Sequence, residues 1–88
     1  MNRIQVILSI DMTNLPENFQ ELVKHEQEVL FKLKEDGVLE HLFLTNTKDA
    51  AVLILKDIDE TKAKNLIESL PLYQLKKNVE YLNLTKQF

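Results

Sequence analysis

The stretch Val38–Lys56, VLEHLFLTNTKDAAVLILK, decides the fold of this chain. Residues 38–45 and 50–56 are rich in apolar and branched side chains, which is typical of β-strands. Between them stands only Asn46-Thr47-Lys48-Asp49, a run of turn-forming residues. Because so short a connection joins neighbouring antiparallel strands, the stretch predicts a β-hairpin. The second strand is apolar on both faces at its centre, which predicts that both faces are covered.

A strand and a helix precede the hairpin. Ile4 to Ile10 alternates apolar and polar side chains over most of its length, the period-two pattern of a strand. The helix that follows is expected to begin near Asn14, which has Glu17 at capping-box spacing. It is expected to end at Gly37, where a helix favours a residue in the left-handed conformation. Its apolar stripe consists of Phe19, Leu22, Val23, Val29, Leu30 and Leu33.

A helix and a strand also follow the hairpin. Asp57 and Glu60 predict the start of the second helix, Pro71 its end, and Val79 to Leu84 the last strand. With right-handed crossovers, the order β-α-β-β-α-β predicts a ferredoxin-like α+β fold. Its four-stranded antiparallel sheet carries both helices on one face. A length of 88 residues predicts a single domain, 1–88.

Two helices cover one face of such a sheet and leave the other face open. Two sets of strand side chains compete for this cover: Leu39, Phe43, Val52, Ile54 and Tyr81 in one set, and Leu42, Leu44, Leu53 and Leu55 in the other. The set that faces away from the helices forms an apolar patch too large for a water-exposed surface. Packing two sheets face to face would bury it. The sequence therefore predicts a homodimer, or a larger assembly of dimers.

Composition removes several classes of function. The chain has no cysteine, which excludes disulfides, thiolate nucleophiles and cysteine-ligated metals. A single glycine is too few for a glycine-rich phosphate loop, and a net charge of −3 argues against a nucleic-acid partner. The sequence contains no membrane-spanning segment and no recognisable signal peptide, so we expect a cytoplasmic protein without a membrane partner.

Glu26 is the residue with the strongest chemical signal. Steps of three and four residues from Leu22, Val23, Leu30 and Leu33 converge on position 26, which places a carboxyl in the stripe that faces the sheet. Burial disfavours a charged carboxylate and raises its pKa, which suits a general acid or base near neutral pH. The alternatives are a tilted helix, or a structural carboxylate paired with a buried cation or a strand hydroxyl.

The two histidines are the other chemical candidates. His41 alternates with Leu39 and Phe43, and if that face meets the first helix, His41 approaches Glu26 and shares a proton with it. Otherwise His41 lies at a strand edge or a dimer seam. His25 is expected at the rim of the helix stripe. The motif H-E-x-x-H is absent, so no metal site is predicted.

The chain resembles the muconolactone isomerase family of small dimeric α+β barrels. The likeness covers roughly residues 22–72. Glu26-Gln27-Glu28, on a helix that ends at Asp36-Gly37, is similar to the family's E-x-E helix. His41-Leu42-Phe43 is similar to its H-L-W strand, and Leu70-Pro71-Leu72-Tyr73 to its L-P-L-aromatic turn.

The resemblance implies an isomerase that moves a proton on a small unsaturated lactone without a cofactor. The site would be a pocket between helices and sheet. By position, Glu26 corresponds to a family glutamate suited to proton transfer, and His41 to a histidine near the pocket. We also expect His25, Phe43 and Tyr73 to contact the substrate, although tyrosines in such places usually belong to the core or an interface.

Three departures from the family pattern limit what the resemblance implies. Phe43 replaces a tryptophan, Leu44 stands where the family has an arginine, and Ala50-Ala51-Val52 replaces a segment with an asparagine. Since the arginine and the asparagine suit a carboxylate-bearing lactone, the resemblance predicts the fold and not that substrate. The leading hypothesis is an isomerase, or a binder of a small and rather apolar molecule. The alternatives are a non-catalytic ligand-binding or oligomerisation module and a cofactor-free monooxygenase of a related barrel family.

Overall fold

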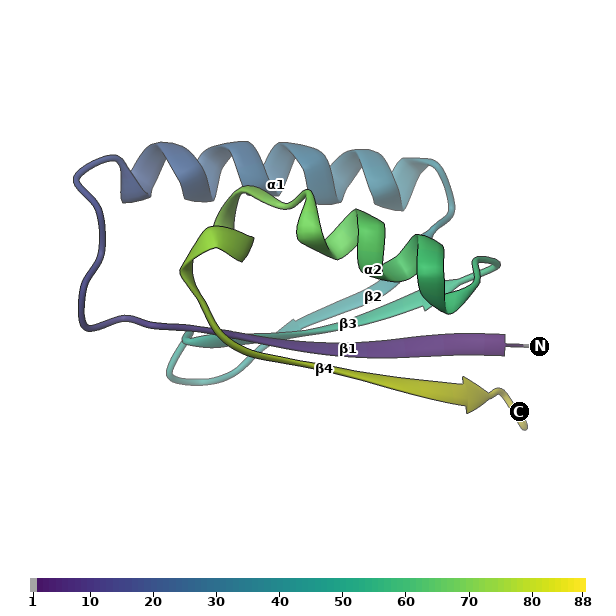
Figure 1. Ribbon diagram of the computed structural model, residues 1–88. Coiled ribbons are helices and arrows are strands. Elements are labelled where there is room, and N and C mark those ends of the chain that lie inside the picture. Colours follow the sequence, from purple (N-terminus) through teal and green to yellow (C-terminus); the bar gives the residue numbers. More distant parts are fainter. Residues whose placement is uncertain (1) are drawn as a thin grey trace.

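The computed structural model describes residues 2–88 and has the predicted order of elements, with one short 3₁₀ helix, η1, added before the last strand (Figure 1). In chain order the elements are β1 Asn2–Ile10, α1 Phe19–Glu35, β2 Leu39–Leu44, β3 Ala50–Lys56, α2 Glu60–Glu68, η1 Pro71–Leu75 and β4 Lys76–Thr85. β4 begins earlier than predicted because it follows η1 directly. Within residues 2–88, no helix has the length and apolar character needed to cross a membrane.

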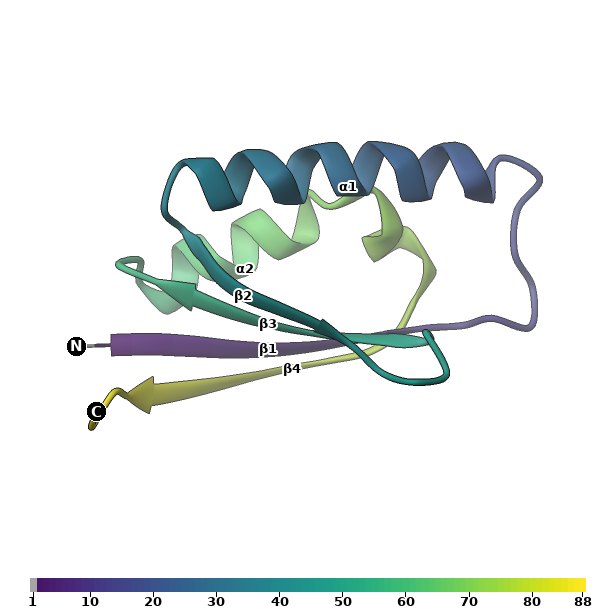
Figure 2. The same ribbon diagram turned by 180° about the vertical axis from the view of Figure 1, so that it is seen from behind.

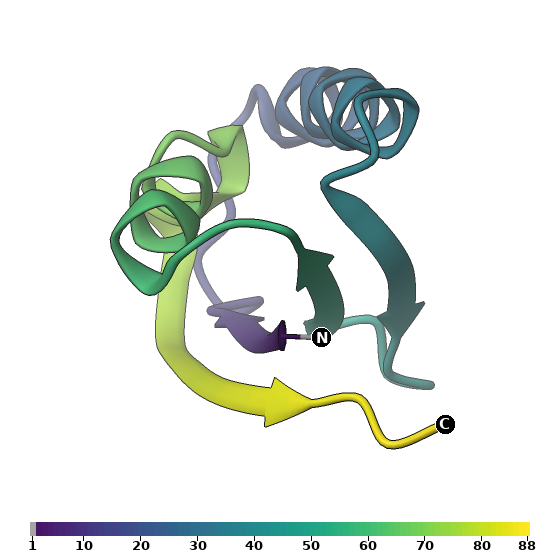
Figure 3. The ribbon, with the colours of Figure 1, turned by 90° about the vertical axis from the view of Figure 1, so that its right-hand side faces the viewer.

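The four strands form one antiparallel sheet in the order β2-β3-β1-β4. β2 and β3 form the predicted hairpin, and β1 lies between β3 and β4. Both helices lie on the same face of the sheet, as the front and back views show (Figures 1 and 2). Seen from the end, α1 lies on the β2 side of the sheet and α2 on the β4 side (Figure 3). This is the predicted ferredoxin-like α+β arrangement, with the second face of the sheet open.

The core lies between the sheet and the helices. Directly opposite residues share a face, so Val6 of β1, Leu53 of β3 and Tyr81 of β4 all point toward the helices. The buried apolar side chains are Ile4, Val6, Leu8, Leu30, Leu39, Leu53, Leu55, Ala63, Ile67 and Leu70. Each large one contributes about 1.5–3 kcal/mol of transfer free energy to folding.

Gly37 ends α1 as predicted. Its φ is +79°, in the left-handed region where a side chain is costly. The N–H of Gly37 donates to the carbonyl of Lys34 at 3.1 Å, and the N–H of Val38 donates to that of Leu33 at 3.0 Å. This pair of bonds is a Schellman motif. It turns the chain so that β2 runs back antiparallel to α1.

Both helices begin later than the capping-box spacing predicted. α1 begins at Phe19, whose N–H donates to the carbonyl of Pro16 at 3.1 Å, and Asn14 caps nothing. The cap of α2 is Asp59, whose carboxylate accepts a first-turn N–H at 2.7 Å. Asp57 has a φ of +61° and belongs to the turn before the helix. The predictions that Asn14 and Asp57 cap the helices were therefore wrong. Both residues precede their helix by several positions and belong to the turn that leads into it.

A β-bulge in β2 determines which side chains of this strand face the helices and which lie on the open face. Leu39 and His41 pair with neighbouring residues of β3, which leaves Glu40 without a partner in the ladder. The expected alternation of Leu39, His41 and Phe43 on one face is therefore wrong. Leu39, Leu42 and Leu44 lie on the helix-covered face, and His41 and Phe43 lie on the open face.

The open face of the sheet carries apolar side chains from all four strands: Ile7, Phe43, Val52, Ile54, Leu82 and Leu84. Phe43 and Leu82 are 58% and 54% exposed. Leu39 and Tyr81, which the sequence grouped with Phe43, lie on the helix-covered face instead. The open face also holds Arg3, which is only 7% exposed and binds both carboxylate oxygens of Glu40, at 2.7 and 3.0 Å.

Candidate functional site

Glu26 lies where α1, η1 and the sheet meet. Its side chain is half-buried, as its place in the apolar stripe predicted. Its Oε1 atom accepts a hydrogen bond from the backbone N–H of Leu72 at 2.9 Å. Leu72 is in the first turn of η1, where an N–H has no acceptor within the helix. The 3₁₀ helix that begins at Pro71 thus presents a donor that orients the carboxyl.

A small cavity adjoins this carboxyl. Its volume is about 60 Å³, room for roughly two water molecules. Its walls come from β1, α1, η1 and the hairpin: Leu8, Ile10, Glu26, Leu44, Lys48, Asp49, Ala50, Ala51 and Leu72. The lining is therefore largely apolar, with Glu26 on one side and two charged residues of the β2–β3 turn on the other.

The two carboxyls at this cavity differ in environment. Burial raises the pKa of Glu26, and the Leu72 N–H opposes that rise only in part. Asp49 accepts hydrogen bonds from the hydroxyls of Thr47 and Thr45, which lower its pKa. When their environments move the pKa values of two carboxyls in opposite directions, one carboxyl holds its proton more readily and the other stays charged. Of these two carboxyls, Glu26 thus holds a proton to the higher pH.

The raised pKa of Glu26 predicts how stability depends on pH. The folded state keeps the Glu26 proton over a range in which the unfolded state has already lost it, so stability falls as pH rises through that range. Glu26→Gln removes the cost of the buried charge and retains an oxygen that can accept the Leu72 N–H. We expect a higher melting temperature than wild type at pH 7 and no difference below the ordinary glutamate pKa of about 4.3. Calorimetry at pH 7 and at low pH checks this, and a variant that is less stable at pH 7 would refute it.

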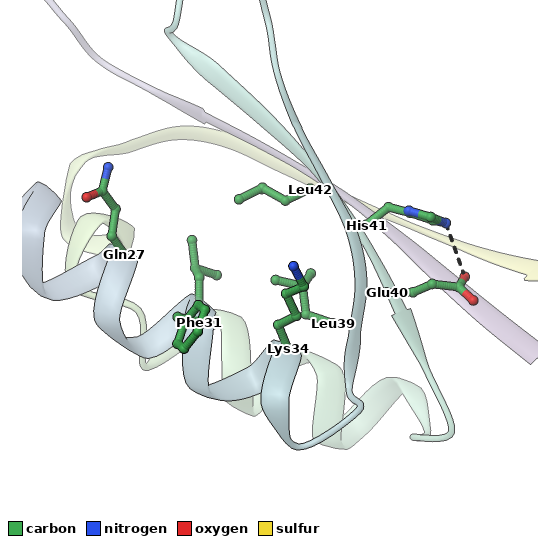
Figure 4. A pocket seen from close by; sticks show the side chains of 8 residues that line it. Gln27, Phe31, Lys34, Leu39, Glu40, His41 and Leu42 are labelled. Atoms are coloured by element: carbon green, nitrogen blue, oxygen red, sulfur yellow. Dashed lines mark ion pairs between the residues drawn. The ribbon is translucent and has the colours of Figure 1, made fainter.

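The structure does not bring His41 to Glu26 within one copy. Because of the bulge, the His41 side chain points away from α1, as does that of Glu40, whereas Leu39 and Leu42 point toward it (Figure 4). The His41 side chain is 60% exposed, and its Nε2 atom lies 4.0 Å from a Glu40 oxygen. The sheet thus separates His41 from Glu26, and of the two alternatives left open by the sequence, the place of His41 on the open face of an edge strand agrees with the second.

The other predicted site residues lie apart from the cavity lining. His25 is exposed on α1, and Phe43 lies on the open face with its ring 6.1 Å from that of His41. Tyr73 lies on η1 and packs against the core, with the Lys76 amine 5.5 Å from its ring. Among residues 2–88, no cluster of three or more side chains suited to hold a metal is found.

Sequence reasoning missed three contributors to the site. The Leu72 N–H is invisible in a side-chain pattern, although the Pro71 that starts η1 was a usable signal. Lys48 and Asp49 were interpreted only as turn residues, and their place at the cavity depends on how the hairpin packs under α1.

No protein-family model and no curated protein matches the chain by sequence. Solved structures do match it, and they share the ferredoxin-like fold described above. A muconolactone isomerase structure aligns with a TM-score of 0.78 and 17% identity, covering 99% of this chain and 91% of the other. An antibiotic biosynthesis monooxygenase aligns with a TM-score of 0.64 and 11% identity, covering 98% of each chain.

A third structure is the 5-chloro-2-hydroxyhydroquinone dehydrochlorinase of Burkholderia phenoliruptrix AC1100 in complex with 2,5-dihydroxybenzoquinone. It aligns with a TM-score of 0.60 and 15% identity, covering 93% of each chain. At these identities the likeness concerns the fold. The resemblance to muconolactone isomerase that the sequence motifs indicated is confirmed at that level.

Proposed function

We propose that this protein binds a small organic molecule between α1, η1 and the sheet and moves a proton on it, with Glu26 as the acid and base and without a cofactor. The observation that carries the proposal is the half-buried Glu26 carboxyl, which is oriented by the Leu72 N–H at 2.9 Å and lines a largely apolar cavity. Two of the structures with the same fold are named as a muconolactone isomerase and a dehydrochlorinase. Both names describe enzymes that act on small organic molecules, which supports this class of function.

The proposed chemistry needs one group that both accepts and returns a proton. The Glu26 carboxylate would take a proton from a carbon next to a carbonyl of the ligand, which leaves an enolate. The neutral carboxyl would then return the proton to the far end of the conjugated system. The double bond shifts, the carboxylate is restored, and no electrons leave the ligand. A raised pKa makes the neutral carboxyl easier to form, so it supports a group that first accepts and then returns the proton.

The role of His41 changes in this proposal. The sequence left two roles open for His41: a partner of Glu26, or a residue at a strand edge or dimer seam. Its place on the open face supports the second role. We propose that two copies pack through their open faces, which would cover Phe43, Leu82 and the other apolar side chains of that face. We also propose a cytoplasmic location, as expected from the sequence.

An exchange experiment tests the proposed activity. Muconolactone and 2,5-dihydroxybenzoquinone, the compounds that the names of the fold relatives suggest, are incubated with the protein in D₂O, and proton NMR follows the loss of C–H signal and any isomer formed. We expect catalysed exchange or isomerisation of at least one compound. If neither reacts although calorimetry shows that one binds, the isomerase proposal is wrong.

The competing function is a non-catalytic ligand-binding or oligomerisation module. The size of the cavity and the hydrogen bond that Glu26 makes with η1 favour it, because a carboxyl that ties a 3₁₀ helix to α1 has a structural use of its own. If the protein is such a module, we expect the exchange experiment to show ligand binding without proton exchange or isomerisation.

A further inference from the structure

A groove of about 400 Å³ runs between α1 and the edge strand β2 (Figure 4). α1 and β2 are antiparallel, so residues late in the helix face residues early in the strand. Gln27 and Leu42 line the groove, and Glu26 and Leu44, the next inward positions of the same two elements, line the small cavity. The groove and the cavity therefore lie next to one another along the same two elements, and we call the two together the trough.

Four of the eight residues that line the groove are apolar, and the other four are polar or charged. Leu30 and Leu39 form its buried base, and Phe31 and Leu42 form its rims. Phe31 is 61% exposed and Leu42 41% exposed, so both offer apolar surface to a ligand. An apolar ligand body laid along the groove would cover both.

The helix side of the groove carries one cationic side chain, Lys34. The residues of α1 that line the groove are Gln27, Leu30, Phe31 and Lys34, and none of them is acidic. The one carboxylate at the groove, Glu40, points away from α1 and is neutralised by Arg3 at 2.7 Å (Figure 4). Lys34 therefore offers an uncompensated positive charge beside Leu39, at the end of the groove farthest from Glu26.

We propose that the trough takes an elongated apolar molecule with a carboxylate at one end. The carboxylate lies at Lys34, the apolar body lies against Leu30, Phe31 and Leu42, and the other end reaches the Glu26 cavity. Lys34 and Glu26 are eight residues apart on one helix, which corresponds to about 12 Å. The trough thus has room for a ligand longer than a compact lactone. The inference rests on the proposed function only for what happens at the Glu26 end.

Calorimetric titration with decanoate below its micelle concentration tests this inference. Its chain is about as long as the distance from Lys34 to Glu26. Decanol, which lacks the charge, and butanoate, which lacks the length, serve as comparison probes. We expect Lys34→Gln to weaken decanoate binding about fivefold and to leave decanol binding unchanged. Lys32→Gln, the same charge change on the opposite side of α1, is the matched control and should change neither. Leu42→Asn should weaken decanoate and decanol alike, and butanoate should bind at least tenfold more weakly than decanoate.

Equal effects of Lys34→Gln and Lys32→Gln would overturn the proposal, because the charge would then act at long range and not in the groove. No binding of decanoate to the wild type would overturn it as well. Both outcomes are independent of turnover, so they leave the proposed chemistry of Glu26 standing. Conversely, loss of that chemistry leaves the decanoate result unaffected.

Discussion

Glu26→Gln is expected to lower the rate of proton transfer by ~10²–10⁴-fold, the range in which a positioned general acid or base contributes. Glutamine retains the shape of the side chain and an oxygen that can accept the Leu72 N–H. It has no proton that it can give and take at neutral pH. The variant should therefore fold, bind ligand and fail in exchange. Proton NMR in D₂O, with the rate per protein molecule compared between variant and wild type, measures the loss.

Glu28→Gln is the matched control for this substitution. It removes the same charge two residues away on α1, at a position that is exposed to solvent. We expect it to exchange at the wild-type rate. Equal rates for Glu26→Gln and wild type would show that the carboxyl at position 26 is structural, and the binding-module alternative would then stand.

Leu82→Lys is expected to convert the proposed homodimer into a monomer. Leu82 is on the open face of β4 and is 54% exposed in one copy, so the substitution spares the buried core. In a face-to-face dimer it places two unpaired ammonium groups in an apolar contact. An uncompensated buried charge costs about 3 kcal/mol or more, which raises the dissociation constant by at least ~100-fold. Sedimentation equilibrium at micromolar concentration measures this change.

Thr61→Lys adds the same charge to the exposed surface of α2, away from the open face, and is the control for Leu82→Lys. We expect it to remain dimeric. A wild type that is monomeric at tens of micromolar would contradict the dimer proposal. So would a Leu82→Lys variant with an unchanged dissociation constant.

Local sequence patterns predicted most of the backbone. The hairpin follows from two apolar segments and a four-residue turn, and the end of α1 follows from the one residue that tolerates a φ of +79°. The inward direction of Glu26 follows from helical periodicity alone. In each case the decisive interactions lie within a few residues of one another.

The faces of β2 could not be predicted in the same way. The bulge at Glu40 is a feature of how β2 pairs with β3, and the bulged residue binds Arg3, which is 37 residues away in the chain. A single extra residue moves His41 and Phe43 to the open face. For this reason His41 lies at an edge strand on the open face, which is one of the two places that the sequence left open for it, and does not approach Glu26 within one copy. The groove between α1 and β2 depends on the same bulge and was not predicted.

The half-buried Glu26 carboxyl is central to the proposed function, and carbon-detected NMR of this carboxyl as a function of pH measures its pKa directly. A spectrum of the Glu26→Gln variant assigns the resonance. We expect the Glu26 carboxyl to titrate above the value of about 4.3 for glutamate in a peptide, and its titration to shift when a ligand fills the cavity. A titration at or below that value, unchanged by a ligand that binds, would contradict the account.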